Sequence, residues 1–80
     1  MRVQLLVTRT DFSLPNLINE CQDLGIEYEV AYVEKNPDLV REMNIRHSPS
    51  VIIDGKLAFR RQPSESELRD YVIDHEFTMH

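Results

Sequence analysis

Residues 3–32 contain a strand, a helix and a second strand in one run: VQLLVTRTDFSLPNLINECQDLGIEYEVAY. Residues 3–7 are almost all apolar, which is typical of a strand that is covered on both faces at the centre of a sheet. The next apolar residues recur every three or four positions and therefore share one helical face: Leu14, Leu17, Ile18, Cys21 and Leu24. Residues 26–32 alternate apolar and polar side chains, which predicts a strand nearer the edge of the sheet. This βαβ unit should close right-handed, with its two strands parallel.

Three helix boundaries are marked by proline, glycine and a capping residue. Pro15 fits the first turn of the first helix, where its missing N–H costs nothing, and Gly25 is typical of a helix end. Asn36 and Pro37 predict the N-cap and first residue of a short second helix. We expect the buried side of this second helix to consist of Leu39, Val40 and Met43.

The last third of the chain predicts a hairpin and a final helix. Asp54-Gly55 lies between two apolar runs, which is a strong hairpin signal. Ser64 and Glu67 have the spacing of a capping box. The expected inner face of the helix that follows consists of Leu68, Tyr71, Val72 and His75. The order βαβαββα indicates an α/β fold with a four-stranded mixed sheet flanked by helices.

Length and charge limit the classes of function. With 80 residues and a net charge of −5, the chain predicts one domain over residues 1–75 and a frayed tail over 76–80. Nucleic acids and anionic membranes are disfavoured as partners because both attract clustered cations. No apolar run approaches the roughly 18 residues of a membrane span, and no signal-peptide pattern is found. A single cysteine excludes an internal disulfide, so we expect a cytoplasmic protein.

Four segments occur in an order known from one fold family: residues 7–11 (VTRTD), 45–51 (IRHSPSV), 54–56 (DGK) and 61–68 (RQPSESEL). Their arrangement resembles the thioredoxin fold, and in detail its short glutaredoxin-like members, over residues 2–74. The resemblance implies a cis peptide bond between Ser48 and Pro49. It also implies that the backbone N–H and C=O of Ser48 face an extended peptide or glutathione.

The same resemblance places Phe12 and Pro15 on the two cysteine positions of the redox motif. In the family, a thiolate at the start of the first helix attacks a disulfide and is released by the second cysteine. Neither residue can perform these steps. Thr10 and Ser13 carry hydroxyls nearby, but a hydroxyl that no base activates is protonated at neutral pH and is a poor nucleophile. We therefore expect no catalytic residue, and the sequence favours a protein that is not an enzyme.

The expected binding face combines two segments: Arg9, Phe12, Ser13 and Pro15 with the loop His47, Ser48 and Pro49. Arg9 matches a basic position that grips a carboxylate in glutathione-binding members, although a solvated loop arginine is an alternative. Phe12 has two open interpretations, as core filling or as an exposed contact.

Cofactor and metal signals are weak. The paired glycines of glutathione-binding relatives are replaced by Arg60-Arg61-Gln62, so we expect no cofactor and treat glutathione as doubtful. Together with Lys56, these arginines predict either a local cationic patch or a solvated sheet edge. The three histidines have no metal-ligand spacing. Cys21 lies on the apolar helical stripe, which favours a buried thiol over a reactive one.

The sequence therefore supports three functional hypotheses. The first is a redox-inactive thioredoxin-like module that binds a protein or an extended peptide, as a monomer or weak homodimer. The second is a residual thiol-disulfide or glutathione-dependent protein that uses Cys21 or bound glutathione. The third is an association module similar to the thioredoxin-like clock proteins, suggested by Lys35-Asn36-Pro37.

Overall fold

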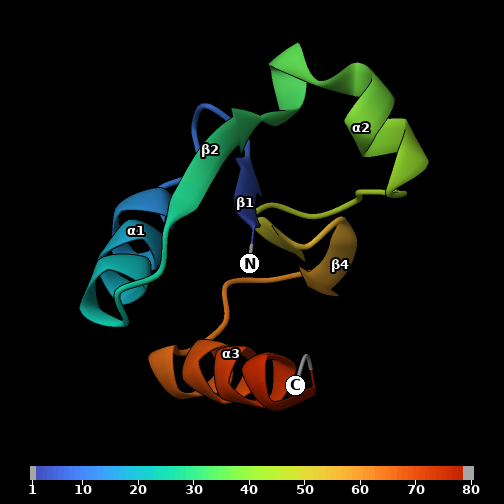
Figure 1. Cartoon of the computed structure of the whole chain (residues 1–80). Helices are drawn as coiled ribbons and strands as arrows, with labels where there is room; N and C mark the ends of the chain where they lie inside the picture. The colour runs from blue at the N-terminus through green and yellow to red at the C-terminus, as the bar shows by residue number, and fades with distance from the viewer. Residues whose placement is uncertain (1, 79–80) are drawn as a thin grey trace.

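The computed structural model describes residues 2–78 and contains a four-stranded mixed sheet with helices around it (Figure 1). In chain order the elements are β1 (Val3–Val7), α1 (Leu14–Asp23), β2 (Tyr28–Tyr32), the 3₁₀ helix η1 (Val33–Lys35), α2 (Pro37–Glu42), β3 (Ser50–Ile53), β4 (Lys56–Phe59) and α3 (Glu65–Thr78). The strand order is β2-β1-β3-β4, with β1 parallel to β2 and the other pairs antiparallel. The predicted α/β class and the order βαβαββα are confirmed, with β1 inside the sheet and β2 at its edge.

The core lies where α1 and α3 pack against the sheet. Strands β1 and β3, helix α1 and helix α3 contribute the buried residues of one cluster: Val3, Leu5, Leu17, Cys21, Val51, Ile53 and Leu68. Phe59 of β4 and Tyr71 of α3 extend it with ring centroids 5.5 Å apart. In Figure 1, α1 and α3 lie to the left of and below the sheet, while α2 lies at the upper right.

The opposite face of the sheet is covered more thinly. Leu6 and Ile52 point away from the core cluster because side chains alternate along a strand, and both are nevertheless fully buried. The expected buried side of α2, formed by Leu39, Val40 and Met43, is only half-buried, so that prediction is wrong in degree. Since α2 has only six residues, it covers a limited area of the sheet.

One capping motif sets both the end of α1 and the start of β2. Gly25 adopts a left-handed φ of 67°, its N–H bonds the carbonyl of Gln22, and the Ile26 N–H bonds the carbonyl of Cys21. These two hydrogen bonds form a Schellman motif. Because Ile26 completes the helix cap, β2 begins at Tyr28 and not at residue 26 as the alternation indicated.

Asn36 occupies the N-cap position of α2 as predicted, but its side chain does not cap the helix. Its amide nitrogen donates to the carbonyl of Tyr32 at 2.8 Å. The 3₁₀ helix, which the sequence analysis did not predict, sets this geometry because it turns the chain between β2 and Asn36. The Asn36 side chain therefore joins α2 to the end of β2.

The capping box of α3 is present. The Ser64 hydroxyl accepts a hydrogen bond from the Glu67 N–H at 3.1 Å, and the Glu67 carboxylate accepts one from the Ser64 N–H at 3.2 Å. Helix α3 continues to Thr78, three residues past the expected domain boundary at residue 75, because neither glycine nor proline interrupts it. The His75 side chain and residues 79–80 lie outside the described residues. Within residues 2–78, no helix is long and apolar enough to cross a membrane.

Two aliphatic residues of α3 test the packing of this helix. Leu68 is fully buried, whereas the Ile73 side chain is 43% exposed. We expect Leu68→Ala to lower the free energy of unfolding by about 2–5 kcal/mol, because it removes buried methyl groups and leaves a cavity. Ile73→Ala should cost under about 1 kcal/mol. Urea titrations followed by circular dichroism measure both values, and equal losses would contradict the packing described.

Candidate functional site

The predicted binding face forms where the end of β1, the start of α1 and the loop before β3 meet. The Ser48–Pro49 peptide bond in this loop is cis. Pro49 is buried beneath the loop, whereas Ser48 and His47 are exposed. The His47 carbonyl accepts a hydrogen bond from the Ser50 hydroxyl at 2.8 Å, which fixes the loop to the first residue of β3.

A hydrogen-bond network centred on Ser48 joins the two segments of the face. The Ser48 Oγ accepts a hydrogen bond from the Thr8 N–H at 3.1 Å and donates to a carboxylate oxygen of Asp11. The other Asp11 oxygen accepts the Ser13 N–H at 2.8 Å. Asp11 was not among the predicted site residues. The spacing Asp11-x-Ser13 is the signal that could have found it, because aspartate bonds to the backbone two residues on in Asx turns.

The network also controls the charge of Asp11. Partial burial opposes ionisation of this carboxyl group, but the hydrogen bonds from the Ser48 hydroxyl and from Ser13 outweigh it and hold the pKa of Asp11 below its usual range. Asp11 is therefore a carboxylate at neutral pH. It supplies a negative charge one residue before Phe12.

The backbone of Ser48 is open to a ligand. Within residues 2–78, neither its N–H nor its C=O has a hydrogen-bond partner, and the residue is exposed. A pocket of about 170 Å³ adjoins it, and we call this hollow the Ser48 pocket. It is lined by Thr8, Val33, Ile45, Arg46, His47 and Ser48.

The residues before α1 are placed at the surface. Phe12 is 93% exposed, so the core-filling interpretation of this residue is wrong. Pro15 is exposed in the first turn of α1, and Ser13 is half-buried at the N-cap without making a side-chain cap. The Arg9 N–H bonds the carboxylate of Glu34 at 3.2 Å, while its guanidinium group has no partner among the described residues.

The surroundings of Cys21 disfavour the thiolate form of its side chain. Its side chain is 0% exposed and packs in the core cluster, as expected from the helical stripe. Burial, and then the nearby charge of Glu20, raises the pKa of the Cys21 thiol to about 11. The thiol is therefore protonated at neutral pH and shielded from solvent.

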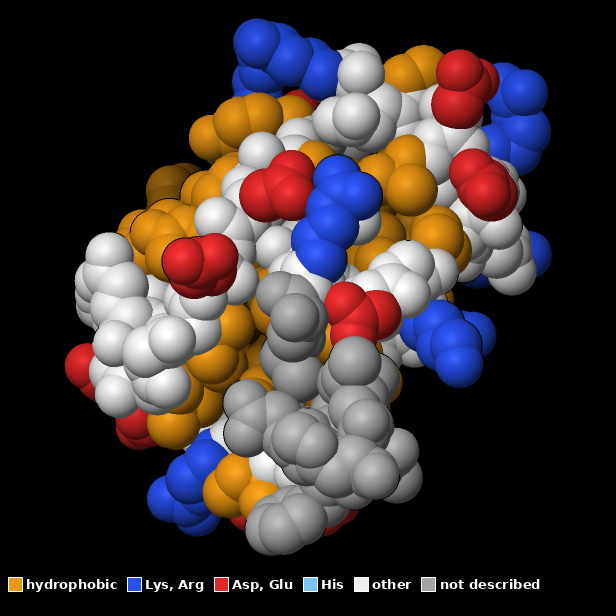
Figure 2. Space-filling view, viewed as in Figure 1, with side chains coloured by type: hydrophobic (Ala, Val, Ile, Leu, Met, Phe, Trp, Pro, Cys, Tyr) orange, Lys and Arg blue, Asp and Glu red, His pale blue; other side chains and the backbone are white. Residues whose placement is uncertain are grey.

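Charge on the molecule is mixed. Figure 2 shows Lys and Arg side chains at separate places on the drawn face, with Asp and Glu between them. The residues coloured by type on this face form no continuous cationic surface. In the described part of the chain, no group of three or more His, Cys, Asp or Glu residues could hold a metal ion.

The burial of Cys21 predicts slow modification. We expect a thiol reagent to label the folded protein at neutral pH only as fast as the protein opens, because the thiol is both inaccessible and protonated. Labelling should become immediate in denaturant, which is the control. Mass spectrometry measures the labelling rate. Fast labelling of the folded chain would contradict the burial of Cys21.

The Asp11 network predicts a pH-dependent contribution to stability. Because the pKa of Asp11 is lower in the folded than in the unfolded state, its stabilisation is present above about pH 4 and is lost as pH falls through the folded value. We expect Asp11→Asn to lower the free energy of unfolding by about 1 kcal/mol at neutral pH and to reduce its decline toward pH 3. Denaturant titrations at both pH values measure this, and the exposed Asp23→Asn is the matched control. An identical decline in wild type and Asp11→Asn would refute the role of Asp11.

Comparison with known proteins agrees with this geometry. The structure of thioredoxin 1 from the thermophilic eubacterium Thermosipho africanus has a TM-score of 0.73 with this chain, at 21% identity and with 100% of each chain covered, which shows the shared fold. No curated protein matches the sequence. The model of the family described as thioredoxin domain matches residues 14–73, which is most of the chain. The chain therefore belongs to the thioredoxin-domain family.

Proposed function

We propose that this chain is a redox-inactive, glutaredoxin-like member of its family that binds an extended segment of another protein. The binding face consists of Arg9, Phe12, Ser13 and Pro15 with the loop His47-Ser48-Pro49. The observation that carries the proposal is the exposed Ser48 backbone, whose N–H and C=O have no partner within residues 2–78 and lie beside the Ser48 pocket. An extended peptide satisfies such a pair by strand addition, which needs no thiol.

The chemistry of the face favours binding over redox turnover. Phe12 and Pro15 replace the two cysteines, and Cys21 is buried with a raised pKa. Asp11 adds a carboxylate beside the former thiol position, and a negative charge disfavours a thiolate. These features weigh against the alternative in which Cys21 or bound glutathione carries out thiol exchange.

Phe12 is the expected anchor of the contact. Its ring is 93% exposed at the corner between β1 and α1, and the adjoining Ser48 network fixes the backbone on both sides of it. Burying a phenylalanine side chain contributes about 1.5–3 kcal/mol. Exposed aromatic residues of this kind are enriched among the residues that dominate binding energy.

The charge balance favours a protein partner in a reducing compartment such as the cytoplasm. A net charge of −5 disfavours nucleic acid, and the single cysteine is a free, buried thiol. Glutathione remains the less favoured ligand because Arg61, at the place of the family's paired glycines, is bonded to Glu67 at 2.6 Å. We treat the protein as a monomer or a weak homodimer.

An amide NMR titration of the isotope-labelled chain tests the proposal. One arm uses a blocked, cysteine-free hexapeptide of alternating Val and Thr, and the other uses reduced glutathione. We expect the peptide to shift the amide signals of residues 9–13 and 47–50, because strand addition forms hydrogen bonds at Ser48. Signals around Gly25, beyond the far end of α1, serve as the internal control. The absence of any shift at Ser48 would refute the peptide-binding face.

A substitution of the exposed ring sharpens this test. Phe12→Ser should weaken hexapeptide binding about tenfold, because about 1.4 kcal/mol of contact is lost, while the stability of the chain is retained. Ile73→Ser is the matched control, since Ile73 is the other exposed large hydrophobic residue among the described side chains and lies on α3. Equal affinities of the two variants would show that Phe12 is not the anchor.

A further inference from the structure

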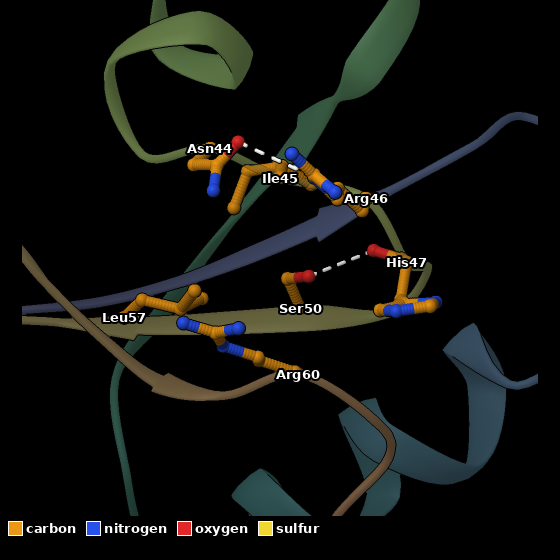
Figure 3. Close-up of a pocket in the computed structure, with 7 residues that line it drawn as sticks. All are labelled: Asn44, Ile45, Arg46, His47, Ser50, Leu57 and Arg60. Atoms are coloured by element: carbon orange, nitrogen blue, oxygen red, sulfur yellow. Dashed lines mark hydrogen bonds between the residues drawn. The ribbon is translucent and has the colours of Figure 1, made fainter.

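A second pocket adjoins the Ser48 pocket and shares Ile45, Arg46 and His47 with it. Its volume is about 30 Å³, and its lining residues are Asn44, Ile45, Arg46, His47, Ser50, Leu57 and Arg60. Figure 3 shows Arg46 on the loop before β3 and Arg60 at the end of β4, with the side chains of Ser50 and Leu57 between the two arginines in this view. We call this hollow the arginine pocket.

The arginine pocket concentrates positive charge without neutralising it. No Asp or Glu is among its lining residues, and neither Arg46 nor Arg60 forms an ion pair with any side chain of residues 2–74. By contrast, Arg2 is paired with Glu29 at 2.8 Å. Arg46 and Arg60 both line this pocket, and two like charges at one pocket repel each other unless an anion lies between them. This arrangement in a chain of net charge −5 indicates recognition of an anion.

Local hydrogen bonds position the Arg46 side chain at the arginine pocket. Asn44 adopts a left-handed φ of 54°, and the Ile45 N–H bonds the carbonyl of Val40 at 2.9 Å, which closes α2 in a Schellman motif. The Asn44 Oδ1 then accepts a weak hydrogen bond from the Arg46 Nε at 3.4 Å. The terminal nitrogens of Arg46 therefore remain available to a ligand.

Ser50 also lines the pocket, but its hydroxyl proton is already used in a hydrogen bond. The Ser50 hydroxyl already donates to the His47 carbonyl at 2.8 Å. Arg46 and Arg60 are the Lys or Arg residues among the lining residues, and guanidinium groups match the planar fork of a carboxylate. A volume of about 30 Å³ holds roughly two water-sized groups, which is the size of the two carboxylate oxygens.

We propose that Arg46 and Arg60 form a carboxylate site, and that its occupant is a Glu or Asp side chain of the peptide bound along the Ser48 loop. The partner of this protein is thus an acidic extended segment. The source of the carboxylate in this inference rests on the proposed function. The shared residues Ile45, Arg46 and His47 place the two pockets next to each other, so one peptide reaches both.

A solvated sheet edge is the competing explanation, since Arg60 directly follows the edge strand β4. Charged residues at an edge discourage strand pairing between molecules. That role requires only charge and gives no selective response to a carboxylate. The two explanations therefore differ in a measurable way.

The experiment compares two hexapeptides of alternating Val and Thr in which one central Val is replaced by Glu or by Gln. We expect the Glu peptide to bind about tenfold more tightly, as judged by amide NMR titration. Arg60→Gln should abolish this preference and leave binding of the Gln peptide unchanged, because Arg60 lines the arginine pocket and not the Ser48 pocket. Arg41→Gln, which removes an exposed charge from α2, is the matched control and should preserve the preference for the Glu peptide.

Sodium acetate and sodium chloride at equal ionic strength separate a free carboxylate from a peptide-borne one. Selective acetate shifts at Ile45 to His47 and near Arg60 support the carboxylate site. Equal affinity for the Glu and Gln peptides, with shifts at Ser48, overturns the site and leaves the Ser48 face intact. If acetate shifts the signals and no peptide shifts Ser48, two proposals are overturned: that a bound peptide supplies the carboxylate, and that the Ser48 face binds peptides. Equal effects of Arg60→Gln and Arg41→Gln overturn the site in favour of general charge.

Discussion

The pairing of β1 with strands on both of its sides is the constraint on which the rest of the structure depends. β1 lies between β2 and β3, and every apolar residue in it is fully buried. This pairing carries the chain out of the sheet at Thr8, beside the loop that enters β3, so that the Thr8 N–H reaches the Ser48 hydroxyl. The antiparallel register, with Leu6 opposite Ser50, fixes how closely the two loops approach. The two segments of the proposed binding face therefore meet because of how the central strands pair.

Much of the fold could be predicted because its signals are local. The apolar run over residues 3–7, the Asp54-Gly55 turn and the Ser64 capping box each depend on neighbouring residues, and each occurs in the structure. Predictions failed where a cap or a tertiary contact overrides a pattern. The alternation over residues 26–32 indicates a longer strand, but the Schellman motif takes Ile26 for the helix end. How deeply the apolar side chains of α2 are buried depends on where this helix lies relative to the sheet, and the periodicity of the sequence does not specify that.

The candidate site, like the fold, could be predicted from the sequence only in part. The resemblance supplied both segments of the face, but not the Asp11 carboxylate that joins them, because Asp11 and Ser48 are 37 residues apart. The exposure of Phe12 also required the structure. The cationic patch suggested by Arg60, Arg61 and Lys56 is divided differently in space: Arg61 pairs with Glu67, whereas Arg60 shares a pocket with Arg46. Two neighbouring arginines of the sequence thus have different surroundings, one in an ion pair with Glu67 and one at the pocket that we propose as a carboxylate site.

The missing cysteines are accompanied by a change in the electrostatics of the face. In thiol members of the family, free N–H groups at the start of the first helix stabilise a thiolate. Here the Ser13 N–H is already bonded to the Asp11 carboxylate, and the Ser48 hydroxyl donates to the same group. A thiol restored at position 12 would therefore lie next to a fixed negative charge, which disfavours its ionisation. The network that holds the Ser48 loop in place would thus disfavour a thiolate at position 12, and this is one of the observations on which the proposed binding role rests.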